Sequence, residues 1–321
     1  MKKNIAIIAG GDSGEFEISI LSANNVMTAL DKKKYNLYLI ITHKGKWNCT
    51  INNKSYEIDK TDFSLSIENK KIKFAAVFII IHGTPGENGL LQGYFDMIGI
   101  KYTGCSALVS ALTFDKAFCN EVVRNFNVVS VAKNIASLRH NPVDLQTIIK
   151  EIGLPLFVKP SQGGSSLATF KVNSEKELAY AINKAFEVDN KVLIEQFIKG
   201  RELTCGVFND ITLPVTEIVT DREFFDYEAK YNGMSKEITP AKIPDTLKQK
   251  VQIAAKEIYL QLGCNGVCRI DFIYNEETDK LFFLEINTVP GQSPQSIIPQ
   301  QVRAMGKTPS WLYNEILQEV L

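Results

Sequence analysis

Two carboxylates in neighbouring apolar runs give the strongest chemical signal in the sequence. Asp271 lies in an alternating run at 269–274, and Glu285 lies in a second run at 281–287 after a short polar turn. An antiparallel hairpin that is symmetric about Thr278 pairs Asp271 directly with Glu285. Facing carboxylates repel unless a cation lies between them, and hard oxygen ligands favour Mg²⁺ or Mn²⁺. We therefore expect a metal site on this hairpin.

The two faces of this hairpin differ in chemistry. The same pairing sets Arg269 opposite Asn287, on the face that carries both acids. The other face is apolar, and the side chains that we expect to face a core are Ile270, Phe272, Leu284 and Ile286. A solvated polar face is the alternative for any lone pair of acids. The arginine, the asparagine and the Pro-Gly step at 290–291 favour a functional site.

A second candidate site is the loop at 161–166, which is rich in glycine and serine. Glycines and small hydroxyl residues let several backbone N–H groups converge on one phosphate, and Lys159 adds a positive charge. An ordinary turn is the alternative for such a stretch. The chain has neither a G-x-x-x-x-G-K-[ST] nor a G-x-G-x-x-G motif, so a nucleotide site in it must be of another type.

The segment 193–198 reads as a strand that leaves the second region and becomes a linker. Backbone groups at such a connection can hydrogen-bond an adenine, and the carboxylate of Glu202 could hold the ribose hydroxyls. As sequence alone, the same segment is a strand followed by an exposed acid.

Composition limits the class of protein. The 321 residues are 45% hydrophobic and carry 36 acidic and 36 basic side chains. Such a chain buries a large core, divided over two or three domains. The balanced charge does not support general binding to nucleic acid or membrane surfaces, so we expect a small-molecule partner. The apolar run at 5–9 is too short for a signal sequence, and no run reaches the ~20 apolar residues of a membrane span, which predicts a cytoplasmic protein.

Six cysteines are scattered along the chain, at 49, 105, 119, 205, 264 and 268. Only Cys264 and Cys268 are near neighbours, and no second pair or nearby histidine completes a zinc site. We therefore expect reduced, mostly buried thiols.

Strands and helices alternate in the first hundred residues. We expect strands at 4–9, 35–42 and 74–81, and helices at 17–30 and 90–98. This alternation predicts a parallel sheet with helices on its faces. Ligands bind at the carboxyl ends of such strands, where the glycine-rich loop at 83–89 lies.

A second region begins near residue 103, and a third near residue 197. We expect the second to contain helices at 106–126 and 174–186 and strands at 156–160, 168–172 and 191–196. Ser174 with Glu177 three residues later forms a capping box. The third region contains the metal hairpin. The predicted domains are 1–103, 104–197 and 198–321.

Seven motifs together resemble the D-alanine:D-alanine ligases of the ATP-grasp superfamily. They follow the family's order and lie at 10–19, 81–89, 158–161, 164–166, 226–231, 269–271 and 285–291. The resemblance implies an α/β (α+β) protein of three domains, in which an N-terminal parallel-sheet (preATP-grasp) domain precedes two ATP-grasp subdomains. It also implies a cytoplasmic enzyme of peptidoglycan precursor synthesis that forms a homodimer through its first region.

The implied reaction joins two D-alanine molecules with ATP as co-substrate. ATP phosphorylates one D-alanine carboxylate, and the amine of the second D-alanine attacks the acyl phosphate to give D-alanyl-D-alanine, ADP and phosphate. Phosphorylation is needed because a carboxylate is a poor electrophile. The resemblance implies two Mg²⁺ or Mn²⁺ ions that neutralise the ATP phosphates, held by Asp271, Glu285 and Asn287.

Carried over position by position, Glu15 would bind the ammonium group of the first D-alanine, in a hydrogen-bonded triad with Ser165 and Tyr231. An alternative that is compatible with this role is that Glu15 and Glu17 stabilise the start of the first helix. His82 resembles the family histidine near the first substrate. Plain packing is the alternative for an isolated histidine after an apolar strand.

The other implied roles concern oxyanions, the second substrate and the nucleotide. Arg269 and the backbone N–H of Gly291 would stabilise the acyl phosphate and the tetrahedral intermediate. Ser296 and Ile297 would bind the carboxylate of the second D-alanine. The implied ATP-binding residues are Lys116, Lys159, Ser165, Ser166, Glu195, Gln196, Phe197, Ile198, Glu202 and Lys230. Surface lysines are the alternative for each of the three lysines.

Tyr231 bears on the choice of second substrate, because a tyrosine there resembles enzymes that form D-alanyl-D-alanine and its loss accompanies D-lactate. Residues 232–242 would close over the site and exclude water. The chain departs from the usual family pattern at 292–299, and at 167–168, where Leu-Ala replaces Val-Gly and should stiffen the phosphate loop. Two alternatives stay open: a related ligase for another D-amino or D-hydroxy acid, and an inactive homologue that only binds ATP.

Overall fold

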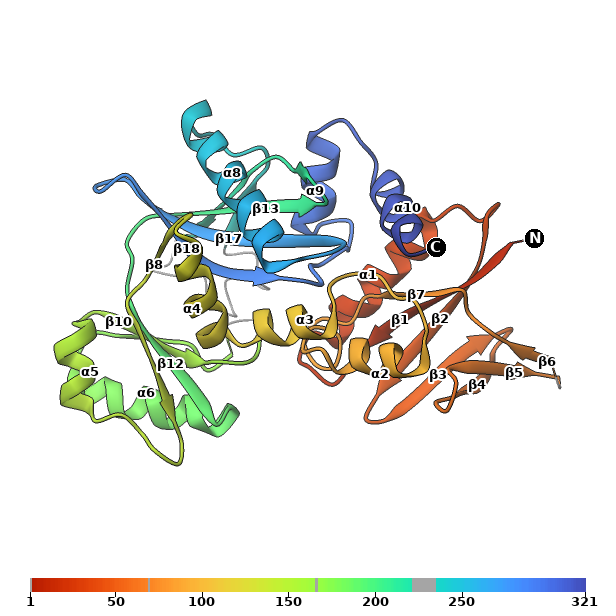
Figure 1. Cartoon of the computed structure of the whole chain (residues 1–321), viewed down its shortest axis with the longest axis horizontal. Helices are drawn as coiled ribbons and strands as arrows, with labels where there is room; N and C mark the ends of the chain where they lie inside the picture. The colour runs from red at the N-terminus through yellow and green to blue at the C-terminus, as the bar shows by residue number, and fades with distance from the viewer. Residues whose placement is uncertain (1, 69, 165–166, 221–234) are drawn as a thin grey trace.

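The structure is a computed structural model that describes residues 2–68, 70–164, 167–220 and 235–321. Its strands form three sheets, and Figure 1 shows one at the N-terminal end of the molecule, a small one at the opposite end and one between and above them. Each sheet has helices packed against it. This mixed α/β architecture with several sheets confirms the predicted fold class.

The N-terminal sheet has the parallel centre that the sequence predicts, because β1 lies between β2 and β7 and both neighbours run parallel to it. Helix α1 connects β1 to β2. The elements of this centre are β1 (Lys3–Gly10), α1 (Phe16–Ala29), β2 (Tyr35–His43), β7 (Ala76–Ile79) and α2 (Leu90–Ile98). The carboxyl ends of β1 and β7 lead into the loops that begin at Gly10 and Ile80, so these loops lie side by side.

Four antiparallel strands extend this sheet, and the sequence did not indicate them. They are β3 (Lys46–Ile51), β4 (Lys54–Asp59), β5 (Ser64–Ile67) and β6 (Lys70–Ile72). β3 and β4 bury one side chain each, Cys49 and Ile58, so their sequence carries little of the alternation that marks a strand.

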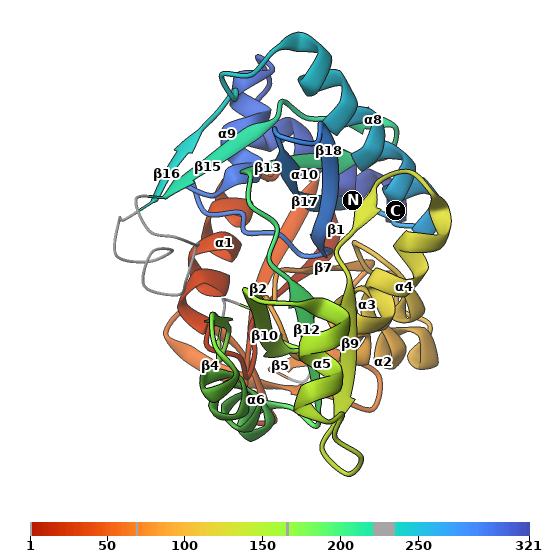
Figure 2. The same cartoon turned by 90° about the vertical axis from the view of Figure 1, so that its left-hand side faces the viewer.

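The second sheet is small and antiparallel, with the order β11-β10-β12-β9. Figure 2 shows α5 and α6 beside this sheet. The elements are β9 (Asn134–Leu138), α5 (Leu145–Ile152), β10 (Leu156–Pro160), β11 (Phe170–Val172), α6 (Glu175–Val188) and β12 (Lys191–Gln196). Ser174 caps α6 as predicted, since its Oγ accepts the N–H of Glu177 at 3.4 Å. β11 begins two residues later than predicted because Ala168 has a left-handed φ of 51°.

The predicted helix at 106–126 is two helices, α3 (Ala107–Phe114) and α4 (Lys116–Phe126). Asp115 breaks it, because its backbone is extended and its side chain accepts the N–H of Phe118 as the N-cap of α4. The alanine and valine periodicity continues through the break, so the pattern alone does not reveal it. The break turns the start of α4 towards the glycine-rich loop.

The third sheet has the order β16-β15-β13-β17-β18-β8, with β14 paired to β13. Its elements are β8 (Ser130–Val131), β13 (Arg201–Phe208), β14 (Ile211–Thr212), β15 (Thr216–Thr220), β16 (Ser235–Ile238), α8 (Asp245–Leu262), β17 (Val267–Asn275) and β18 (Lys280–Asn287). Buried side chains of α3, α4 and α8 share one hydrophobic core with β13, β17 and β18. The last helices, α9 (Ile297–Ala304) and α10 (Pro309–Val320), return to pack against the N-terminal sheet and α1 (Figure 1).

The hairpin predicted to bind metal is β17 and β18, and a bulge corrects one part of its prediction. Ile270, Phe272 and Ile286 are buried in the core as expected, but the pairing shifts between Asp271 and Phe272. Because of this shift, Phe283 enters the core in place of Leu284, which is half-buried outside it.

Among the described residues, no helix has the length and apolar character needed to cross a membrane.

Candidate active site

The acidic face of the hairpin forms as predicted. Asp271 pairs with Glu285, and Arg269 pairs with Asn287, in the antiparallel register of β17 and β18. The Asp271 carboxylate is only 3% exposed and accepts hydrogen bonds from the side chains of Arg269, Asn287 and Thr204. These donors fix the positions of both carboxylate oxygens. Side-chain oxygens of Asp271, Glu285 and Asn287 therefore lie on one face, where they could bind a metal ion that prefers oxygen ligands.

Arg269 is held in a fixed position beside Asp271. Its Nη2 lies 2.7 Å from Oδ2 of Asp271, and its Nε lies 2.9 Å from Oδ1. Burial lowers the pKa of Arg269, but the charge and hydrogen bonds of Asp271 outweigh burial and raise that pKa well above its usual value. The guanidinium is therefore a permanent cation with a fixed orientation.

Lys116 joins the hairpin to the glycine-rich loop. Its Nζ donates to the carbonyl oxygen of Gly163 at 2.6 Å and lies 3.8 Å from a carboxylate oxygen of Glu285. Burial lowers its pKa, and the neighbouring Lys159 adds to that shift, while Glu285 opposes it. Lys159 in turn pairs with Glu195 at 2.5 Å, and both side chains are buried. The structure thus brings the two predicted lysines near each other, and each lies beside its own carboxylate.

The glycine-rich loop has an anchor that sequence reasoning missed. Ser161 Oγ donates to Oδ1 of Asp115 at 2.6 Å, and Lys191 lies 2.7 Å from Oδ2 of the same carboxylate. The N–H of Lys116 also donates to the carbonyl oxygen of Ser161, at 2.9 Å. Asp115 is one position before the predicted Lys116, but nothing in the local pattern marks it as the residue that ends α3. This anchor fixes the loop against α4.

Glu15 lies against this loop from the other side. It occupies the N-cap position of α1 but makes no capping hydrogen bond with its side chain. A methyl group at Gly164 would come within 3.1 Å of Oε2 of Glu15, so the carboxylate faces the loop directly. Ser13 ties the neighbouring backbone to the end of the next strand, because its Oγ donates to the carbonyl oxygen of His82 at 2.7 Å.

His82 is buried and bridges the N-terminal sheet to the third region. Its Nδ1 lies 2.7 Å from the carbonyl oxygen of Val289, and its Nε2 lies 3.2 Å from Oγ of Ser22. Burial lowers the pKa of this imidazole, although Glu15 opposes the shift. A neutral ring can donate from one nitrogen and accept at the other, which matches these two contacts.

The turn after β18 is held by several side chains that the sequence did not single out. Ser22 Oγ accepts the N–H of Gln292 at 3.0 Å, and Asn25 donates to the carbonyl oxygen of Gln292 at 2.7 Å. Gly291 packs under Ser296, since a methyl group at Gly291 would come within 2.8 Å of Oγ of that serine. Both helix α1 and the predicted Ser296 therefore shape the turn that carries the Gly291 N–H.

Ser296 and Ile297 lie where α9 begins, at its N-cap and first helical position. Ser296 Oγ is 2.8 Å from Oγ of Ser293, and Ile297 is buried. A helix N-terminus attracts a carboxylate, so the position suits the predicted second-substrate role.

The predicted nucleotide strand is β12 and the turn that leads from it into β13. The Gln196 N–H donates to the carbonyl oxygen of Lys133 at 2.8 Å, and the Phe197 ring lies 4.5 Å from Nζ of Lys171. Ile198 follows in the turn, and Glu202 lies on β13 opposite Ile273 of β17. The predicted Ser165, Ser166, Lys230 and Tyr231 lie outside the described residues.

Part of the predicted closing segment at 232–242 has a different structure. Residues 235–238 form β16, which pairs with β15, and Ala241 donates its N–H to the carbonyl oxygen of Val215 at 2.7 Å within the core. Paired backbone and a buried side chain hold this part in the third sheet, so it is not a free loop. Residues 232–234 lie outside the described residues.

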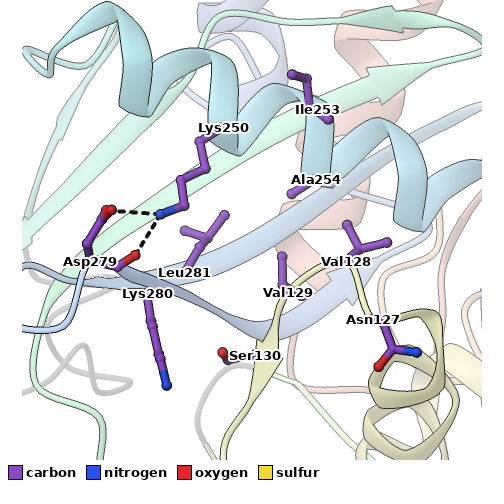
Figure 3. Close-up of a pocket in the computed structure, with 10 residues that line it drawn as sticks. All are labelled: Asn127, Val128, Val129, Ser130, Lys250, Ile253, Ala254, Asp279, Lys280 and Leu281. Atoms are coloured by element: carbon purple, nitrogen blue, oxygen red, sulfur yellow. Dashed lines mark hydrogen bonds and ion pairs between the residues drawn. The ribbon is translucent and has the colours of Figure 1, made fainter.

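A surface hollow of about 550 Å³ lies elsewhere, beside α8 and β18 (Figure 3). Lys250 crosses its edge and donates to the Asp279 carbonyl oxygen at 2.6 Å. None of the predicted site residues lines this hollow, and we assign it no role.

Comparison with known proteins identifies the family. Residues 4–105 match the model of the D-Ala-D-Ala ligase N-terminus, and residues 123–318 match that of the C-terminus. A D-alanine–D-alanine ligase of Phocaeicola vulgatus is 45% identical over 311 residues, which are 95% of each chain. One of Flavobacterium johnsoniae is 45% identical over 309 residues, again 95% of each chain.

Solved structures agree with these matches. The VanG D-Ala:D-Ser ligase of Enterococcus faecalis has a TM-score of 0.90 at 32% identity and covers 100% of both chains. The D-alanyl-alanine synthetase A of Vibrio cholerae has a TM-score of 0.89 at 26% identity, over 99% of this chain and 98% of that one. A Bacillus anthracis D-alanine–D-alanine ligase complexed with ATP has a TM-score of 0.78 at 27% identity, over 99% and 96%. The chain therefore belongs to the D-alanine–D-alanine ligase family of ATP-dependent enzymes.

Proposed function

We propose that this protein joins two D-alanine molecules to D-alanyl-D-alanine, with ATP converted to ADP and phosphate, for peptidoglycan precursor synthesis in the cytoplasm. Family membership supports the reaction. The observation that carries it to these residues is the register of β17 and β18, which sets Asp271 opposite Glu285 with Arg269 and Asn287 on the same face. Through bound divalent metal ions and Arg269, such a face would hold the phosphates of ATP and stabilise the charge that develops when they react.

The first substrate would lie between Glu15 and His82. The Glu15 carboxylate is suited to the ammonium group of D-alanine, and it faces the glycine-rich loop at Gly164. The buried His82 would form one side of this position, and its contacts with Val289 and Ser22 fix its ring. The D-alanine carboxylate then points towards Arg269, where the transferred phosphoryl group arrives.

Two bonds change in the second step. The neutral amine of the second D-alanine forms a C–N bond to the acyl carbon, the C–O bond to phosphate breaks, and the amine proton leaves to solvent or to phosphate. Arg269 and the Gly291 N–H would stabilise the oxyanion of the tetrahedral intermediate. Ser296, at the N-terminus of α9, would orient the carboxylate of the incoming D-alanine.

The donor set of this face fits Mg²⁺ or Mn²⁺. Asp271, Glu285 and Asn287 offer side-chain oxygens, which are the ligands that these ions take in nucleotide sites. When bound, the metal neutralises phosphate charge and orients the γ-phosphoryl group. Lys116 and Lys159, which lie next to Glu285 and Glu195, would bind the same phosphates. We extend the nucleotide site to Ser165, Ser166, Lys230 and the segment from Glu195 to Ile198 with Glu202, and the first-substrate triad to Tyr231.

A second candidate substrate is D-serine in place of the second D-alanine. The solved D-Ala:D-Ser ligase matches this fold with a TM-score of 0.90. The altered sequence at 292–299 adjoins the proposed second-substrate position at Ser296. Phosphate release from ATP with D-alanine alone, or with D-alanine and D-serine, followed by identification of the product, separates the two functions.

We also propose a homodimer formed through the first region. Two large apolar side chains on α2 of this region are exposed, Leu90 by 62% and Met97 by 89%, and Leu108 on the adjoining α3 is exposed by 77%. A second copy of the chain would bury them.

A further inference from the structure

Three buried thiols outside the candidate active site converge from segments far apart in the sequence. Cys105 precedes α3, Cys264 follows α8, and Cys268 lies on β17. Their Sγ atoms all lie within 4.8 Å of one another, and those of Cys105 and Cys268 are 3.6 Å apart. Only Cys264 and Cys268 are neighbours in the sequence, so it is the fold that brings Cys105 next to them.

The spacing of these sulfurs matches a metal centre. Thiolates bind d¹⁰ ions at about 2.3 Å, which places three sulfurs in a plane around one ion about 4 Å apart. The 3.6 Å between the sulfurs of Cys105 and Cys268 and the 4.8 Å limit on the other separations bracket this value, so the three sulfurs are close enough to share one ion. The described residues add no histidine, aspartate or glutamate to the group.

The sulfur of Cys105 contacts both backbone polar groups of Asn265, because it lies 3.5 Å from the carbonyl oxygen of that residue and also accepts its N–H. The backbone N–H of Asn265 donates to its Sγ at 3.5 Å, and Cys105 lies directly before the N-cap of α3, at the positive end of that helix. The helix end and the Asn265 N–H both suit the thiolate form that metals bind.

We propose that Cys105, Cys264 and Cys268 bind one Cu(I) ion through their three sulfurs. Soft thiolate ligands select Cu(I) or Zn(II), and structural zinc takes four ligands, whereas Cu(I) is satisfied by three. Each thiol that binds as a thiolate releases its proton to solvent. The site is new to this chain and does not depend on the ligase reaction.

Bound copper would cross-link two backbone segments that are already in contact. A methyl group at Gly266 would come within 2.9 Å of Cα of Gly104, so the segment that enters α3 packs tightly on the one that leads from α8 into β17. Cys264 is 7% exposed and Cys105 is 1% exposed, so the side of Cys264 is the entry route for the ion. Loading should therefore raise the thermal stability of the full chain.

An anaerobic titration of the reduced full-length protein with Cu(I), in competition with a chromophoric Cu(I) chelator, tests the proposal. We expect one copper per chain and a rise in melting temperature. Cys105→Ala should weaken binding by more than the roughly 10- to 100-fold that loss of an outer-shell partner costs. The matched control is Cys119→Ala, because Cys119 is another buried cysteine of the same core but lies outside the group.

The controls decide between the outcomes. Equal copper affinity for wild type, Cys105→Ala and Cys119→Ala overturns the proposal, and so does a wild type that yields all copper to the chelator. Binding of Zn(II) but not Cu(I) at these cysteines also overturns it. If Cys105→Ala does not fold, Cys264→Ala replaces it, because that side chain lies at the edge of the group.

Discussion

Glu87 accepts the backbone N–H of Val289 at 3.1 Å through Oε1, across the boundary between the N-terminal sheet and the third region. Its other oxygen accepts the N–H of Gly83 at 2.7 Å. His82 binds the carbonyl oxygen of Val289 at 2.7 Å, so both backbone polar groups of this residue are held by side chains from the first region. Val289 lies two residues before Gly291, and this clamp therefore positions the proposed oxyanion donor.

Glu87→Gln should lower kcat while leaving the KM for ATP nearly unchanged. Glutamine has the same shape, but its NH₂ group cannot accept a hydrogen bond. That group must face the N–H of either Gly83 or Val289, so one of the two hydrogen bonds is lost. We expect kcat to fall roughly 10- to 100-fold, which is the effect of displacing a catalytic group by a fraction of an ångström to an ångström. Steady-state kinetics of the variant beside Asn88→Asp, a change in the same loop that does not touch Val289, measure this. Equal kcat in both variants would show that the clamp does not serve catalysis.

Glu87 should also make stability depend on pH. Burial and the neighbouring Glu15 raise its pKa from 4.5 to about 7, while Arg269 opposes the shift. Lys116 also faces this carboxylate. Between these two pKa values the folded state binds more protons than the unfolded state, so this group's contribution to the unfolding free energy falls as pH rises through the window and is constant above about 7. In urea unfolding, the unfolding free energy of wild type should fall relative to that of Glu87→Gln as pH rises from about 5 to about 8. A difference that stays level or moves the other way contradicts the raised pKa.

Asp271→Asn should abolish most turnover at any Mg²⁺ concentration. The change removes a charged metal ligand and the partner of Arg269, so we expect kcat to fall by roughly 10² or more. Asp279→Asn is the matched control, because Asp279 is an exposed acid on the same hairpin that pairs with Lys250. If Asp271→Asn turns over like wild type with magnesium, the metal assignment is wrong.

Ala168→Gly should stabilise the protein modestly. Ala168 has φ 51°, a left-handed conformation that costs an alanine roughly 1–2 kcal/mol and that glycine adopts without this cost. Glycine also makes the unfolded chain more flexible, which lowers the unfolding free energy by about 0.4–1 kcal/mol and offsets part of the stabilisation. We therefore expect a rise of about 0.5–1 kcal/mol in unfolding free energy by urea titration. Ala179→Gly, within α6, should lower it by about 1 kcal/mol. A loss of stability in Ala168→Gly would show that the loop does not carry this strain.

Met97→Asp should convert the proposed homodimer to a monomer. The substitution places a charge on the most exposed apolar side chain of α2, where an interface would have to bury it. Sedimentation velocity of wild type, Met97→Asp and Ile253→Asp measures the change, with Ile253 as another exposed apolar residue, on α8. Dimers that persist in Met97→Asp rule out this face.

The hairpin shows how much of the site can be predicted from sequence. A regular alternation and a short turn determine which residues share a face, so Asp271, Glu285, Arg269 and Asn287 could be placed together before any coordinates. The bulge at Leu284 of β18 could not be predicted, because an extra residue in one strand leaves the alternating pattern of the partner strand β17 intact.

The anchors of the site illustrate what local patterns miss. Asp115 ends α3 through contacts with Ser161 and Lys191, which are 46 and 76 residues away. Ser22, Asn25 and Glu87 hold the turn after β18 from helices and loops of the first region. Such contacts depend on how the three sheets pack together, which a one-dimensional pattern does not contain.

The most direct test of the proposed function is phosphate release from ATP and Mg²⁺ with D-alanine, L-alanine, D-lactate, or D-alanine plus D-serine, together with identification of the product. We predict release that requires D-alanine and yields D-alanyl-D-alanine, with Asp271→Asn inactive. Release that yields mainly D-alanyl-D-serine would assign the second substrate differently. No release with any of these compounds, in protein that still binds ATP, would contradict the account.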